Sequence, residues 1–278
     1  VPQGQSEDAD PRIVEYFETY GFYILYDFRE ADMFWNNTSW GGGVAMRQGN
    51  PAYANAMLDL IEDAFFNYWP ERYMKYLPMK VLLCSQLDDM NTCRPTGGEQ
   101  YTSYTRINLW EGFDNIALNG CSAEIDTMTL YSKGRFQAET NAYMLRLLLE
   151  SGEISVPQEF IDADALGYAY QGFWQNSQTD SMFSAGYLNN QTLTTDVQTS
   201  AENDFRYYLD LAAMPLEILE GEPAVFNYDD LYLRTEPPLW GCMNSARDPW
   251  GRIRAKYNAM IDYLREQGFP VDVWQSSE

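Results

Sequence analysis

Apolar and polar residues alternate along the chain with two different periods, which predict helices and strands. Apolar residues recur every three or four positions, the spacing of an amphipathic helix, in the stretches 12–20, 52–69, 201–219 and 249–268. Short runs rich in β-branched, aromatic and aliphatic residues predict strands at 22–28, 79–87, 105–110 and 115–118. A further short helix is expected at 159–167. The first half therefore mixes helices with strands and the second half is mainly helical, which predicts an α+β fold.

The most apolar of the predicted helices lies within residues 126–151. Its apolar positions surround most of the helix: Phe136, Ala138, Ala142, Tyr143, Met144, Leu145, Leu147, Leu148 and Leu149. A helix that is apolar nearly all round is buried in the middle of a domain. Lys133 and Gly134 are expected to precede it, and Ser151 and Gly152 to follow it.

Glu139 is a carboxylate inside this central helix. Its burial is costly unless it is paired, bound to a metal or placed at the edge of a cavity. It either lies on the one wet face or meets Arg135 or Arg146, or it is a residue of a catalytic site.

The segments between these elements are polar, and we expect loops at 29–50, 88–103 and 220–246. Residues 168–200 are rich in aromatic and amide side chains and predict a long surface excursion. Such loops often carry recognition, although an ordered loop without a ligand is the commoner case. Aromatic side chains stack on sugars and bind peptides. The ligand-binding candidates are Tyr168, Tyr170, Phe173, Trp174 and Tyr187.

The domain organisation follows from the same pattern. Residues 1–10 are polar and predict a flexible tether, while residues 11–278 show no linker and predict a single domain. This domain divides into an α/β part, 11–125, and a mainly helical part, 126–278. We expect no membrane-spanning segment, because no run of about 20 apolar residues occurs.

Charge and composition exclude several classes of function. The chain of 278 residues has a net charge of −23, which repels nucleic acid and anionic lipid headgroups. It contains no histidine, which rules out Ser-His-Asp and Cys-His nucleophile systems and a conventional histidine zinc site. Calcium could bind at Asp88, Asp89 or the acidic segment 226–230, although none of these has EF-hand spacing. Otherwise no cofactor is expected.

The four cysteines allow two disulfide bridges with three possible pairings. Cys84 and Cys93 bracket a short polar segment, so a local bridge between them is one interpretation. It leaves Cys121 to pair with Cys242 over a long range. Four buried free thiols are the alternative.

Several stretches together resemble one family of zinc-binding metallopeptidases, surface lipoproteins encoded beside SusC/SusD-type outer-membrane importers. The resemblance is carried by YGFYILYDF (20–28), MKVLLCS (79–85), the central helix, FSAGYLNNQTLTTDVQTSAENDFRYYL (183–209) and RAKYNAMIDYLREQGFPVD (254–272). It covers most of residues 11–273 and implies a zincin-like fold with a zinc helix at its centre.

The chain departs from this family where the chemistry belongs. The zinc helix reads H-E-x-x-H, in which two histidines hold the metal and the glutamate activates water. This chain has Ala138 and Ala142 at the histidine positions, while Glu139 remains at the position of the general base. In the later acidic helix, which the family uses for a third ligand, Asn203 replaces an acidic residue and Asp204 survives. The resemblance therefore implies a degenerate site without zinc.

Two functions from different classes remain open at this stage. The resemblance implies a catalytically inactive surface lipoprotein of the outer membrane, held by a lipid anchor upstream of Val1. It would serve a SusC-type TonB-dependent transporter and a SusD-type lipoprotein as an accessory subunit that binds glycan or peptide during nutrient import. The alternative is a hydrolase of the glycosidase type, which needs only two carboxylates in an open cleft. Its candidate pairs combine Glu139 with Asp126, Glu202 or Asp204.

Overall fold

The computed structural model describes residues 10–36, 43–93, 101–169, 180–189, 192–223 and 239–276. Its contacts divide the chain into two compact units. The first comprises Val1–Phe136 and Asn227–Thr235, and the second comprises Gln137–Phe226 and Glu236–Glu278. The predicted tether of residues 1–10 lies outside the described residues, apart from Asp10. The single domain of residues 11–278 stays a prediction.

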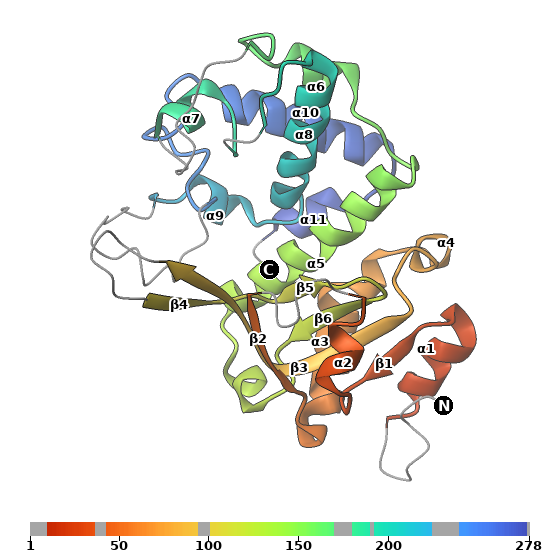
Figure 1. The fold of residues 1–278 in the computed structure, drawn as a ribbon. Coiled ribbons are helices and arrows are strands. Elements are labelled where there is room, and N and C mark those ends of the chain that lie inside the picture. Colours follow the sequence, from red (N-terminus) through yellow and green to blue (C-terminus); the bar gives the residue numbers. More distant parts are fainter. Residues whose placement is uncertain are drawn as a thin grey trace. The chain divides into compact units, whose positions relative to one another are not determined.

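A six-stranded mixed sheet forms the centre of the first unit (Figure 1). Its longest strand, β3 (Lys80–Cys93), pairs with four others. Strands β1 (Tyr23–Leu25) and β6 (Asn115–Asn119) run parallel to its first half. Strands β2 (Val44–Gln48) and β4 (Tyr101–Arg106) run antiparallel to its second half. Strand β5 (Leu109–Glu111) pairs with β6 in antiparallel orientation.

Both faces of the first half of β3 are buried. Successive strand residues point to opposite faces, so Leu82 and Cys84 share one face and Val81 and Leu83 share the other. The first face packs into a core with Phe28, Met33, Phe34, Val44, Leu87 and Ala117. Because water reaches neither face, the strand reads as a continuous apolar run, as buried parallel strands do.

The helices of the first unit are short. They are α1 (Arg12–Tyr20), α2 (Glu30–Met33), α3 (Ala54–Ala64) and α4 (Glu71–Met74), with 3-10 turns at Pro51–Tyr53, Phe66–Tyr68 and Ala123–Thr127. Helix α1 ends where the sequence predicts, at Gly21, which has φ 83° and donates its backbone N–H to the Phe17 carbonyl. The left-handed conformation favours glycine at this position.

Helix α5 (Leu130–Glu150) runs from the first unit into the second and confirms the predicted central helix. Phe136 and the residues from Ala138 to Leu145 are largely buried. The helix starts earlier than predicted and contains both Lys133 and Gly134. Thr129 explains this start, because its Oγ1 accepts a hydrogen bond of 3.1 Å from the Ser132 backbone N–H, as an N-cap does.

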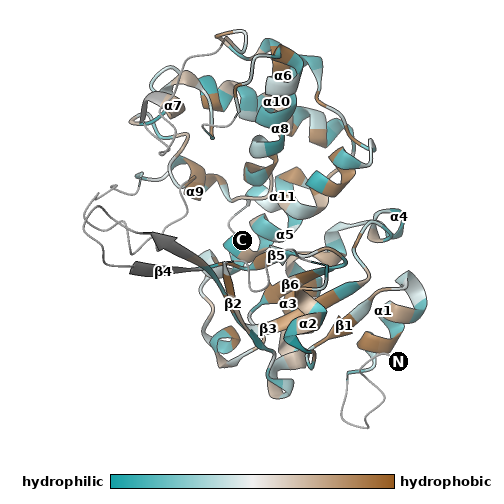
Figure 2. Cartoon of the chain, viewed as in Figure 1, coloured by the Kyte–Doolittle hydropathy of each residue, from teal (hydrophilic) through white to brown (hydrophobic). Residues whose placement is uncertain are grey.

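The rest of the second unit is helical. It comprises α6 (Gln158–Asp162), α7 (Asp180–Ala185), α8 (Val197–Tyr208), a 3-10 turn at Leu209–Leu211, α9 (Leu216–Glu220), α10 (Arg252–Glu266) and α11 (Val271–Gln275). Helix α10 is in contact with α6, α7, α8 and α11. Aromatic rings join these helices edge to face, with Phe160 centred 5.1 Å from both Phe205 and Tyr208. Helices α8 and α10 carry both brown and teal positions in Figure 2, as amphipathic helices do.

Three predicted loops contain regular structure. Residues 29–50 include α2 and β2, and residues 88–103 include the second half of β3 and the start of β4. Residues 168–200 include α7 and the start of α8. The second half of β3 is polar, at Asp88, Asp89, Asn91 and Thr92, so no apolar run marks it, and its pairing with β2 and β4 holds it extended. Within the described residues, no helix is both long and apolar enough to span a membrane.

Candidate functional site

The degenerate motif lies on the buried part of α5. Ala138 and Ala142 are one turn apart and are each 2 % exposed. Between them, Thr140 and Asn141 are buried, and their side chains donate to the Gln137 carbonyl at 3.2 and 2.7 Å. Glu139 is half-buried. The helix surface that would carry metal ligands is therefore packed as core.

These residues do not fit a zinc ion. Alanine has no lone pair to donate, so positions 138 and 142 supply no ligand. On α8, the Asn203 side chain is half-buried and donates to the Thr192 carbonyl at 3.5 Å. Asp204 is fully buried, and the cation bound to it is the ammonium group of a lysine, Lys256. Among the described residues no group of three Cys, Asp or Glu side chains is arranged to hold a metal.

A lysine side chain, rather than a metal ion, is the partner of Asp204. Lys256 on α10 is fully buried, and its Nζ lies 2.6 Å from Asp164 Oδ1 and 2.7 Å from Asp204 Oδ2. The same ammonium donates to the Gly186 carbonyl at 3.0 Å. Helices α8 and α10 and the segment after α6 thus meet at one buried cation, which we call the Lys256 cluster.

Three tyrosine rings enclose the Lys256 cluster. The ammonium lies 4.1 Å from the ring centre of Tyr187, 5.0 Å from that of Tyr168 and 5.8 Å from that of Tyr208, which are cation–π distances. The Tyr168 hydroxyl donates to Asp204 Oδ2 at 3.1 Å, and the Tyr187 hydroxyl donates to Asp164 Oδ2 at 3.2 Å. The three tyrosine rings therefore pack around the Lys256 ammonium.

The cluster holds two carboxylates and one ammonium, so one negative charge is in excess. Burial raises the pKa of Asp204 to about 6, although Lys256 opposes this shift. Burial also raises the pKa of Tyr168 and of Tyr187, and both neighbouring carboxylates add to these shifts. The tyrosines therefore stay neutral and act as hydrogen-bond donors.

Two of the five predicted ligand-binding aromatic residues, Tyr168 and Tyr187, are corrected by their positions. Tyr168 is 2 % exposed and Tyr187 is fully buried, so neither ring offers a surface for stacking. They are core residues because their hydroxyls satisfy the buried carboxylates. Tyr170, Phe173 and Trp174 lie outside the described residues.

The predicted disulfides are also corrected. Cys84, Cys121 and Cys242 are buried free thiols. Cys84 and Cys93 lie nine residues apart on the one strand β3, which separates them by about 30 Å at the rise of an extended strand. A disulfide needs Cα atoms within about 7 Å. Burial raises the pKa of Cys84 to about 12 and that of Cys121 to about 11.

Three of the carboxylates proposed for other chemistry have partners within the protein. Asp204 is buried in the Lys256 cluster, and Glu202 accepts from Gln198 on the surface of α8 at 2.9 Å. Of the calcium candidates, Asp88 receives the Arg106 guanidinium at 2.6 Å, and residues 226–230 lie outside the described residues. These contacts count against Asp204 as a glycosidase carboxylate, while the pairing of Glu139 with Asp126 stays a prediction.

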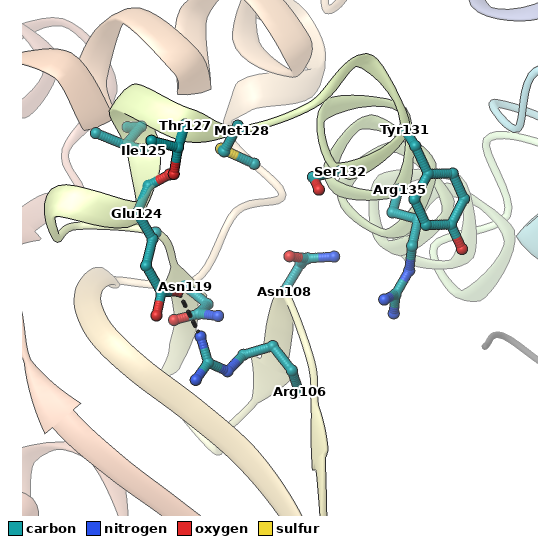
Figure 3. Close-up of a pocket in the computed structure, with 11 residues that line it drawn as sticks. Arg106, Asn108, Asn119, Glu124, Ile125, Thr127, Met128, Tyr131, Ser132 and Arg135 are labelled. Atoms are coloured by element: carbon teal, nitrogen blue, oxygen red, sulfur yellow. Dashed lines mark hydrogen bonds and ion pairs between the residues drawn. The ribbon is translucent and has the colours of Figure 1, made fainter. Parts of the chain in front are cut away.

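A separate open pocket of about 300 Å³ lies in the first unit (Figure 3). It is bounded by the end of β4, the end of β6, the 3-10 turn Ala123–Thr127 and the first turns of α5. Arg106 and Asn108 enter from the sheet, Glu124 from the 3-10 turn and Ser132 from α5. We call this group the sheet-edge pocket.

Polar contacts fix the walls of the sheet-edge pocket. Arg106 lies between two carboxylates, with its Nε 2.6 Å from Asp88 Oδ1 and its Nη1 2.7 Å from Glu124 Oε2. The Asn119 backbone N–H donates to the Asn108 carbonyl at 2.9 Å. The Asn119 side chain is 6 % exposed, and its Oδ1 has no hydrogen-bond partner among the described residues. This residue of the pocket wall therefore carries a buried acceptor that lacks a partner among the described residues.

Sequence reasoning missed both groups of residues. A signal for the Lys256 cluster does exist, because Lys256 falls on the apolar stripe of its helix, three residues after Ile253 and four before Met260. A lysine there requires a buried anion. The residues of the sheet-edge pocket come from four elements and have no common spacing.

Comparisons with known proteins agree with the fold. No protein-family model matches the sequence, and no curated protein matches it. The structure is similar to a crystal structure described as a putative zinc-binding metallo-peptidase from Bacteroides caccae. The TM-score is 0.51 at 10% sequence identity, and the match covers 98% of this chain and 89% of that chain. At this identity the likeness shows the fold alone, so the chain has a metallopeptidase-like α+β fold.

Proposed function

We propose that this protein is a catalytically inactive, metallopeptidase-like surface lipoprotein that serves as a binding or scaffold subunit. It would belong to the outer membrane, held by a lipid anchor upstream of Val1, and act with a SusC-type transporter and a SusD-type lipoprotein. The metallopeptidase-like fold supports the architecture. The sequence resemblance motivates the importer partners and the location.

One observation carries the inactive part of this proposal. Asp204 is the surviving acidic residue of the degenerate site, and the Lys256 ammonium is bound to it at 2.7 Å in a fully buried environment. A fixed ammonium cannot accept a water molecule as a ligand or lower its pKa as a metal does. With Ala138 and Ala142 also without donor atoms, the residues present support binding rather than hydrolysis.

A metal and peptidase assay tests inactivity directly. The purified protein is incubated with zinc, freed of excess metal and analysed for bound zinc per chain, and a broad peptide library is assayed with and without chelator. We expect far less than one zinc per chain and no cleavage. Stoichiometric zinc together with cleavage that chelator abolishes would refute the proposal.

A native pull-down tests the partners separately. The full chain is tagged at its C-terminus in the producing cells, and membranes are solubilised in mild detergent. We expect recovery of a large TonB-dependent barrel protein and its lid lipoprotein, compared with a tagged, unrelated surface lipoprotein as the control. Recovery of the chain alone would contradict the importer role and leave inactivity to the first assay.

A further inference from the structure

We infer that the sheet-edge pocket binds a sugar ring of a neutral glycan. This inference rests on the proposed binding function and names the class of its ligand and the residues that contact it. Four observations carry it: the charge balance of the pocket, its unpartnered buried acceptor, the mixture of its polar groups and its volume.

The charge balance argues against an anionic ligand. Arg106 and Arg135 line the pocket, but Glu124 also lines it and Asp88 lies against Arg106. The formal charges of these four side chains cancel. The two carboxylates that contact Arg106 engage its Nε and Nη1, so part of the guanidinium already has anionic partners. The net charge of −23 opposes anions further.

The unpartnered acceptor favours a ligand that carries a hydrogen-bond donor. Asn119 Oδ1 is buried beside the pocket without a partner among the described residues, and a buried acceptor left unpaired costs free energy. A hydroxyl group can donate to this oxygen and accept from a neighbouring donor at the same time. Vicinal hydroxyls on a sugar offer this combination twice on one ring.

The remaining walls suit the same ligand. Glu124 lies on one side of the space, and Ser132 and Asn108 lie on the other (Figure 3). Met128 and Tyr131 add apolar surface, and an aromatic ring can pack against the C–H face of a sugar. A volume of about 300 Å³ is at the lower end for small-molecule sites, which favours a single ring over an extended peptide.

The test uses binding to arrayed ligands and four variants of the full chain. Arrays of neutral oligosaccharides, acidic oligosaccharides and uncharged tripeptides are probed, and the best neutral oligosaccharide is titrated by calorimetry. Asn119→Leu removes the acceptor, and Ser132→Trp fills the pocket. Their matched controls are Asn55→Leu and Thr19→Trp, at exposed helical positions of the same unit. Circular dichroism and thermal melting verify that each variant is folded.

We expect a neutral oligosaccharide to bind, with its association constant reduced about tenfold in Asn119→Leu by the loss of one hydrogen bond. Binding should be lost in Ser132→Trp and unchanged in both controls. Binding that neither pocket variant weakens would overturn the site, and preference for acidic glycans or tripeptides would overturn the ligand class. Failure of every neutral glycan to bind would overturn the inference, while the metal assay and the pull-down would still decide the proposed function.

Discussion

Replacing Lys256 by methionine should strongly destabilise the protein at neutral pH. Methionine keeps the length and apolar stem of the side chain but removes the ammonium that lies within 3.0 Å of three oxygen acceptors. The carboxylates of Asp164 and Asp204 then remain buried without a cation, since both side chains are fully buried. The tyrosine hydroxyls donate one hydrogen bond to each, which does not compensate a whole charge.

The magnitude follows from the burial of this cluster. Removing one partner of a buried ion pair costs about 3–5 kcal/mol, because the remaining charge is left unpaired in a medium of low dielectric. The total free energy of unfolding of a globular protein is about 5–15 kcal/mol. Lys256→Met should therefore remove a large part of the stability.

The pH dependence gives this prediction a definite sign. In the native protein the pKa of Asp204 is raised from 3.8 to about 6, so its contribution to stability is present below pH 3.8 and is lost as the pH rises through 6. Without Lys256 the Asp204 carboxylate should ionise at still higher pH, because Lys256 lowers its pKa in the native protein. Each proton that the native state alone binds adds about 1.4 kcal/mol of stability per pH unit as the pH falls. The penalty of Lys256→Met should therefore shrink between pH 7 and pH 5.

Urea unfolding followed by tryptophan fluorescence at pH 7 and pH 5 measures these quantities. Lys75→Met is the matched control, because Lys75 is exposed and lies over the ring of Tyr76. It should change the free energy of unfolding by less than about 0.5 kcal/mol at both pH values. The triple variant that combines Lys256→Met with Asp164→Asn and Asp204→Asn should recover part of the loss, because it removes both uncompensated charges. A loss in Lys256→Met below 1 kcal/mol, or one equal at the two pH values, would refute the reasoning.

The other predictions concern packing, thiols and metal. Gly49→Ala should lower the free energy of unfolding by about 1–3 kcal/mol in a urea titration. The new Cβ would lie 2.7 Å from the Leu83 carbonyl oxygen and 2.8 Å from Cys121 Sγ. An unchanged free energy of unfolding would contradict this packing. Cys84, Cys121 and Cys242 should resist iodoacetamide in the native state and react after unfolding, as peptide mass spectrometry can show, since all three are buried free thiols. Rapid native labelling, or a disulfide at any of them, would contradict this. Zinc should leave the melting temperature unchanged, because a metal stabilises only a native state that binds it; a rise that grows with zinc concentration would indicate a site.

The sequence predicts those elements whose apolar pattern matches their burial. Helix α5 and strand β6 are apolar over most of their length and appear where the pattern predicts them. The apolar pattern predicts the start of helix α8 less well: the helix starts at Val197, four residues before the predicted start at residue 201. Asp196 sets the start, since its Oδ2 accepts from the Thr199 backbone N–H at 2.7 Å. An N-cap residue can be identified in a sequence only when the predicted helix reaches the position that directly follows it.

Strands held by backbone pairing are harder to predict than strands held by a core. The second half of β3 carries Asp88 and Asp89, and its partner β2 has two exposed residues at its end, Arg47 and Gln48. Their ladder satisfies the backbone groups without an apolar pattern. Strand propensity depends on such context more than helix propensity does. The polar residues that suggest a loop here are therefore compatible with a strand.

The side chains of this chain favour binding over catalysis, whereas a fold alone does not determine a function. A chain that is 10% identical to its structural neighbour can share the architecture while every catalytic position differs. In this chain the positions that would hold a metal carry methyl groups, at Ala138 and Ala142, and the surviving acidic residue, Asp204, is bound to an internal ammonium. A buried ion cluster is weak support for stability, since apolar residues can often replace it. It is stronger support for lost metal chemistry, because the carboxylate remains and its cation is now part of the chain. Within the described residues, the sheet-edge pocket places polar groups around an open space, and a ligand should be sought there.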